Sequence, residues 1–159
     1  MQWCVKVEMW ACTKGEHQPG VKNIDQISLK LIVMETISMD ELKQFLKYGN
    51  FPLQPTQQRI CLPIIQRIYR KMQIGVKFEN INVDNLLLIN GHHRYICALL
   101  LQKELIKNEW KSPSNVMKLL WSAIVIDSND WESTEIIKRH NLSDAARSEI
   151  DIKVLEDLT

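Results

Sequence analysis

The stretch LLINGHHRYICALLL, residues 87–101, places two histidines and one arginine between two apolar segments. The short apolar segment before Asn90 is typical of a buried strand. Asn90 and Gly91 favour a turn, and the six consecutive apolar positions at 96–101 predict a helix that is buried on most sides. The stretch therefore predicts a strand that turns directly into a buried helix.

A strand-to-helix junction of this kind is suited to binding an anion. The first backbone N–H groups of a helix have no partners within the helix, and the helix macrodipole is positive there. Gly91 lets an anion approach the backbone, and Arg94 lies in the first turn, where its guanidinium can bind a phosphate bidentately. His92 and His93 can donate hydrogen bonds or carry a proton near neutral pH. The competing interpretation is an ordinary polar turn that only ends a strand.

The rest of the chain yields an order of elements from its periodicity and turn residues. Ser38 and Glu41 form the capping-box pattern that begins a helix, and Gly49 is placed to end it in the left-handed conformation. Asp84 and Asn85 favour the turn of a hairpin. The predicted elements are strands at 3–11 and 29–37, a helix at 39–48, an extended loop at 50–59, a helix from Pro63 to Gly75, a hairpin of strands at 76–83 and 86–89, the helix after Gly91, a strand at 122–126, and a helix at 131–139 followed by a second cap at Ser143.

These elements predict a single α+β domain over residues 1–159, with a small mixed β-sheet and packed helices. The 20 basic and 19 acidic residues give a net charge of +1, so no overall field attracts nucleic acid. No apolar run is long enough to span a membrane, and charges at Lys6 and Glu8 interrupt the apolar start. The four cysteines form no C-x-x-C pair. We expect a cytoplasmic protein with reduced cysteines, a Cys4–Cys12 disulfide being the alternative.

The run INGHHRYICALLL, which follows a helix ending at Gly75 and a hairpin, resembles the ParB/sulfiredoxin superfamily. The signature of that superfamily is a strand, an acidic or polar residue, and G-x-x-R at the start of a helix. The resemblance covers roughly residues 29–105. It implies a ParB/sulfiredoxin-like fold with a turn that cradles nucleotide phosphates: CTP in ParB partition proteins, ATP in sulfiredoxins and ADP in archaeal free-serine kinases. The implied cofactor is ATP, ADP or CTP, with or without Mg²⁺, and the implied binding residues are Asn90, Gly91, His92, His93 and Arg94.

Two departures from the family pattern bear on chemistry. His92 stands where sulfiredoxins have their cysteine, so their attack on an oxidised cysteine cannot occur here by that route. Asn90 stands where the kinase-like relatives have an acidic residue, and an amide cannot act as a general base. A base would therefore come from elsewhere in the fold.

The other candidates for chemistry lie outside the junction. Glu35, at the end of a predicted strand, is the carboxylate best placed to act as a base, alongside His92 and His93 as catalytic candidates. Arg59, after the proline-containing loop, is a candidate second phosphate ligand. For both Glu35 and Arg59 the alternative is an ordinary surface charge.

The remaining polar and aromatic patterns have simpler interpretations. Asp127 and Asp130 could hold Mg²⁺, but we expect Asp130 or Asn129 to cap the following helix and assign no resident metal. Indoles can stack on a base, but Trp121 and Trp131 are expected in the core. A solvated helix face is expected for the basic residues, Arg67, Arg70 and Lys71.

Two functions of different classes remain open. The leading expectation is a nucleotide-binding domain that transfers or hydrolyses phosphoryl groups, with Gly91 and Arg94 holding the phosphate and a histidine assisting. The alternative is a non-enzymatic interaction protein on the same fold, such as an immunity, antitoxin or regulatory module that binds another protein. Asn90 in place of an acid favours this alternative. A ParB-like nuclease ranks third, because the sequence shows no basic groove or metal-binding carboxylate pair.

Overall fold

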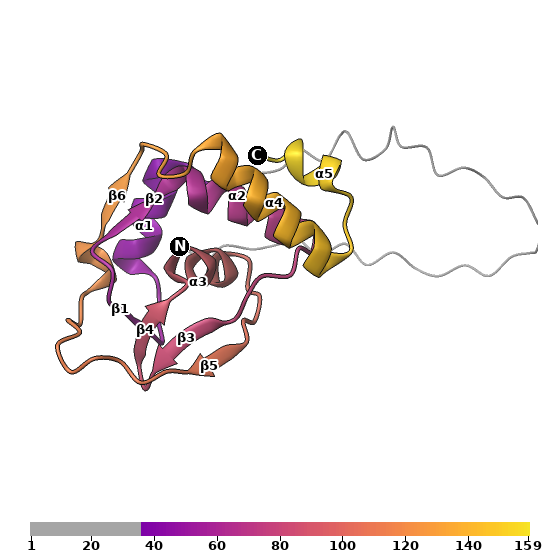
Figure 1. The fold of residues 1–159 in the computed structure, drawn as a ribbon. Coiled ribbons are helices and arrows are strands. Elements are labelled where there is room, and N and C mark those ends of the chain that lie inside the picture. Colours follow the sequence, from indigo (N-terminus) through magenta and orange to yellow (C-terminus); the bar gives the residue numbers. More distant parts are fainter. Residues whose placement is uncertain (1–35) are drawn as a thin grey trace, which may run out of the picture. The chain divides into compact units, whose positions relative to one another are not determined.

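The computed structural model describes residues 36–159, which form an α+β fold (Figure 1). This confirms the expected fold class. Four of the predictions lie outside the described residues. They are the strand at 3–11, most of the strand at 29–37, Glu35 as a candidate base, and the alternative Cys4–Cys12 disulfide. Residues 36 and 37 are not in a strand, so the end of the second prediction is wrong. The extent of the domain over residues 1–159 stays a prediction.

Helices and strands alternate along the described chain. The helices are α1 (Met39–Tyr48), α2 (Leu62–Gln73), α3 (His92–Leu100), the 3₁₀ turn η2 (Trp121–Ala123), α4 (Thr134–Ser148) and α5 (Ile152–Glu156). The strands are β1 (Gln54–Pro55), β2 (Arg59–Cys61), β3 (Ile81–Asp84), β4 (Leu87–Asn90), β5 (Lys107–Glu109) and β6 (Val125–Asp127). Among these helices none is long and apolar enough to cross a bilayer.

The strands form one mixed sheet and a separate parallel pair. The four-stranded sheet has the order β1-β4-β3-β5, in which only β3 and β4 are antiparallel. The two-stranded sheet pairs β2 with β6. Helix α3 contacts both β3 and α2, so its first turn is fixed between the sheet and a helix (Figure 1).

The local sequence signals explain how α1 and the hairpin form. The capping box is present, because Glu41 N donates to Ser38 Oγ at 3.2 Å and Ser38 N donates to Glu41 Oε2 at 2.8 Å. Gly49 follows α1 but is extended, with φ −67°, and not left-handed. A Cβ there would lie 2.6 Å from the Phe45 carbonyl oxygen, so the glycine is required by close packing. The predicted hairpin is confirmed as β3 and β4, although its first strand begins only at Ile81.

The region after β6 differs from its prediction. Instead of a short helix at 131–139 and a second cap, one continuous helix, α4, extends to Ser148. Its N-cap is Ser133, whose Oγ accepts a hydrogen bond from Ile136 N. The prediction that Asn129 or Asp130 caps this helix is therefore wrong. Ser143 and Asp144 therefore lie inside a helix and do not begin one, and Asp144 pairs with Lys71 of α2.

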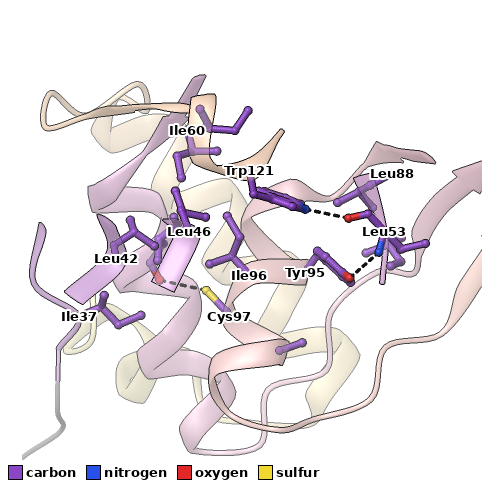
Figure 2. Packing of buried hydrophobic residues seen from close by; sticks show 14 of the residues in the cluster. Ile37, Leu42, Leu46, Leu53, Ile60, Leu88, Tyr95, Ile96, Cys97 and Trp121 are labelled. Atoms are coloured by element: carbon purple, nitrogen blue, oxygen red, sulfur yellow. Dashed lines mark hydrogen bonds between the residues drawn. The ribbon is translucent and has the colours of Figure 1, made fainter. Parts of the chain in front are cut away.

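The apolar core surrounds α3 and is tied by buried hydrogen bonds (Figure 2). Trp121 Nε1 donates to the Leu53 carbonyl at 2.7 Å, and Leu53 N donates to Tyr95 Oη at 3.0 Å. Ile96 is fully buried, and Trp121 is buried as predicted. Each such large apolar side chain contributes about 1.5–3 kcal/mol when it is removed from water. The core therefore fixes the position of α3, and with it the turn at its start.

Candidate anion-binding pocket

The turn at the start of α3 requires its glycine. Gly91 is the N-cap of α3 and has left-handed dihedrals, φ 92° and ψ 28°. A Cβ there would lie 2.7 Å from Ile81 Cγ2 and 3.2 Å from Arg94 Nη2. No side chain of the described residues caps this helix end. The first-turn N–H groups are therefore not used by a capping side chain, and they keep the positive end of the helix dipole beside Arg94.

A pocket of about 400 Å³ opens onto this turn. Its walls come from α2, residues 78–79, the turn at 90–94, Glu132 and α4. A volume of this size lies within the usual range for small-molecule sites. The structure thus brings Asn90, Gly91, His92, His93 and Arg94 together at one cavity.

Both histidines of the turn accept hydrogen bonds from backbone N–H groups through Nε2. His92 Nε2 accepts from Thr56 N at 3.1 Å, and His93 Nε2 accepts from Cys61 N at 2.9 Å. The neutral ring must then carry its proton on Nδ1. Among the described residues no hydrogen-bond acceptor is found for His93 Nδ1, although His93 lines the pocket.

The same surroundings keep both imidazoles neutral. Burial lowers the pKa of His92 to about 4, against the opposing effect of a hydrogen bond to the Leu88 backbone. Burial, followed by the charges of His92 and Arg94, lowers the pKa of His93 to about 4. Near pH 7 these side chains are uncharged, and because both Nε2 atoms already accept hydrogen bonds, only the Nδ1–H of His93 is left to contact a ligand.

Arg94 lies at the edge of the pocket in a network of opposite charges. Its Nη1 donates to the Glu79 carbonyl oxygen at 2.8 Å and lies 3.7 Å from Glu79 Oε2. Arg147 Nη2, from α4, is 3.0 Å from the other carboxylate oxygen of Glu79. Burial lowers the pKa of Arg94, but an arginine stays charged at physiological pH.

The basic residues of α2 are not on a solvated face, which corrects the sequence prediction. Arg67 is 7% exposed and donates to both oxygens of Asp130, at 2.6 and 2.8 Å, and to Glu132 at 2.7 Å. Lys71 is 4% exposed and lies 2.7 Å from Asp144 in α4. Arg70 donates through Nε to the Leu158 carbonyl oxygen. The Lys71–Asp144 pair joins α2 to α4, and the pairs of Arg67 join α2 to the segment that precedes α4.

Helical spacing could have revealed these pocket residues. Arg67 and Lys71 follow Ile64 by three and seven positions, so they share its face of α2. Burial alone would lower the pKa of Arg67, but the hydrogen bonds to Asp130 and Glu132 outweigh it and raise that pKa. Charged residues on a partly apolar face indicate a buried ion-pair network when acidic partners follow in the chain.

Arg59 and the acidic turn do not join the pocket lining. Arg59 is an exposed residue whose Nη2 lies 2.6 Å from Asp127 Oδ2. Trp131 Nε1 also donates to Asp127, at 2.9 Å, and the Trp131 ring packs edge-on against His93. Trp131 is 40% exposed, so its predicted core position is wrong. Residues 36–159 contain no group of three or more side chains suited to hold a metal ion.

Comparisons with protein-family models, curated proteins and solved structures found no match to this chain. The resemblance to the ParB/sulfiredoxin superfamily therefore stays a prediction that rests on the residues of the turn.

Proposed function

We propose that this protein binds a nucleotide, with a phosphoryl group seated at the turn formed by residues 90–94. The observation that carries the proposal is the shared cavity. The glycine-initiated start of α3 and the guanidinium of Arg94 line the same pocket of about 400 Å³. Helix N-termini and arginine are the two groups that proteins use most readily for phosphate.

Three donors would hold the phosphoryl group. The N–H groups of the first α3 turn supply the helix dipole, Arg94 supplies a full charge, and His93 supplies a neutral Nδ1–H. Because the pKa of His93 is about 4, this donor keeps the same protonation state throughout the physiological pH range. A nucleotide is a suitable ligand because apolar side chains of Ile64, Ile68 and Ile137 line the same cavity.

Binding without catalysis is the second candidate, and a specific observation favours it over phosphoryl transfer or hydrolysis. The Nε2 atoms of His92 and His93 both accept backbone hydrogen bonds, so neither is available to remove a proton from an attacking hydroxyl group or water. Asn90 has no basic group. The chain then acts as a nucleotide-responsive interaction module that binds another protein, in place of a phosphotransferase or nucleotide hydrolase.

Thermal unfolding with AMP, ADP, ATP, CMP and CTP, each with and without Mg²⁺, tests the proposal. A nucleotide at a hundred times its dissociation constant adds about 2.7 kcal/mol and raises the unfolding midpoint by several degrees. The Arg94→Ala variant should lose this increase. The matched control is Arg139→Ala, because Arg139 is an exposed arginine of α4 outside the pocket lining.

Two results would refute the proposal. One is that no nucleotide changes the midpoint of the wild-type protein at millimolar concentration. The other is that Arg94→Ala, folded by circular dichroism, keeps the full increase. Phosphate release from ATP, ADP or CTP by the purified protein would refute the second candidate alone, provided that an Arg94→Ala preparation lacks the activity.

A further inference from the structure

The charges of the pocket fall into two groups that differ in burial. Arg67 and Lys71 form ion pairs in which most of each partner's side chain is shielded from solvent. The Lys71 and Asp144 side chains, for example, are 5% and 9% exposed. Removing a partner from a buried pair leaves an uncompensated charge and is strongly unfavourable. These two cations are therefore held by the protein and are not available to a ligand.

The second group consists of Arg94, Arg147 and Glu79. Arg147 also lies 3.3 Å from Asp144 of the first group. The Glu79 side chain is 69% exposed, and its two carboxylate oxygens lie 3.7 Å from Arg94 and 3.0 Å from Arg147. The Arg94 and Arg147 side chains are only 15% and 30% exposed, so Glu79 is the accessible member of the group and places a negative charge beside both guanidiniums. The carboxylate lies where two arginines converge, which is the arrangement that a phosphoryl group would also use.

We propose that Glu79 limits the ligand of this pocket to one phosphoryl group, as in a nucleoside monophosphate or a phosphodiester. The inference rests on the proposed nucleotide site and specifies its substrate class. One phosphoryl group is bound by the α3 turn and Arg94. Further phosphoryl groups would meet the carboxylate of Glu79, with Asp144 and Glu132 also lining the pocket. The negative charges of these carboxylates would repel the additional phosphoryl groups and so weaken their binding.

The pocket's charge balance supports this limit. Its lining carries four cationic side chains, Arg67, Lys71, Arg94 and Arg147, and three acidic ones, Glu79, Glu132 and Asp144. The difference between these two sets of side chains is one positive charge, and Asp130 outside the lining also pairs with Arg67. A site for a triphosphate needs a larger excess of cations or a bound metal ion, because only unpaired charges attract the ligand.

Titration calorimetry with the AMP, ADP, ATP and CMP, CDP, CTP series tests the inference, in EDTA so that no cation masks the ligand charge. The wild-type protein should bind one monophosphate at least as tightly as its triphosphate. Glu79→Gln should tighten triphosphate binding by about fivefold and change monophosphate binding by less than about twofold. This variant keeps the backbone carbonyl to which Arg94 donates.

The control is Glu109→Gln, which removes the same charge from the exposed strand β5, outside the pocket. It should leave all six affinities unchanged. Wild-type binding of a triphosphate tenfold tighter than its monophosphate would overturn the inference and leave the proposed function intact. An equal change in triphosphate and monophosphate affinity in the Glu79→Gln variant would also overturn the inference. If none of the six ligands binds either protein, the proposed function falls and the inference with it.

Discussion

The two ends of α3 lie in opposite environments. From Tyr95 onward the helix is packed in apolar side chains around Trp121, whereas its first turn borders a pocket whose walls carry seven charged side chains. The apolar end is held by burial, which is tolerant of partner identity. The pocket beside the first turn is held by ion pairs that require a particular partner at a particular distance, Lys71–Asp144 between its walls and Arg94–Glu79 at the turn. The comparison indicates that apolar burial stabilises this fold, whereas the charged side chains are the groups able to recognise a ligand.

Truncation of the apolar end should have the largest effect. Ile96→Ala removes a fully buried side chain, which should lower the free energy of unfolding by about 4 kcal/mol through lost burial and a cavity. Denaturant unfolding measures this value. The exposed residue Ile106, changed to alanine, serves as control and should have little effect. A loss below about 1 kcal/mol for Ile96→Ala would contradict the core described here.

Breaking the ion pair between the pocket walls formed by α2 and α4 should have the next largest effect. Lys71→Met leaves Asp144 buried without its closest cation, which should lower the free energy of unfolding by about 3 kcal/mol. The double variant Lys71→Met with Asp144→Leu should recover most of that loss, since no unpaired charge remains. If the double variant is as unstable as the single one, the pair is not the source of the effect.

The histidines of the turn should make stability depend on pH. Both have a folded-state pKa of about 4, below the usual value of 6.5, so the unfolded chain binds their protons more readily. The free energy of unfolding should therefore fall as the pH is lowered from about 6.5 towards 4, by about 3 kcal/mol per histidine, and level off below that. His92→Gln should remove roughly half of this slope. A flat stability between pH 6.5 and 4.5 would contradict the burial of these rings.

Sequence reasoning recovered the elements whose signals are local. Ser38 and Glu41 specify the start of α1 by themselves, and Gly91 marks the junction of β4 and α3 because the backbone there needs a positive φ. Strand β5 was missed, since Lys107, Asn108 and Glu109 are exposed polar residues whose strand structure comes from pairing with β3.

The candidate site was recovered only in part, for a related reason. The turn residues are adjacent in sequence, but the walls of the pocket are assembled from α2, α3 and α4. Lys71 and Asp144 are 73 positions apart, and nothing local indicates that they meet. Arg59 was expected near the phosphate site but is paired with Asp127 through the parallel strands β2 and β6.

The central claim is that a nucleotide phosphoryl group lies at the start of α3, and backbone amide NMR tests it most directly. AMP or ATP, whichever binds more tightly in calorimetry, is titrated into the ¹⁵N-labelled protein and into Arg94→Ala. The amide signals of His92, His93 and residue 94 should shift most in the wild-type protein and should not shift in the variant. Largest shifts elsewhere, for example around the second cavity beside Leu99 and Lys107, would contradict it.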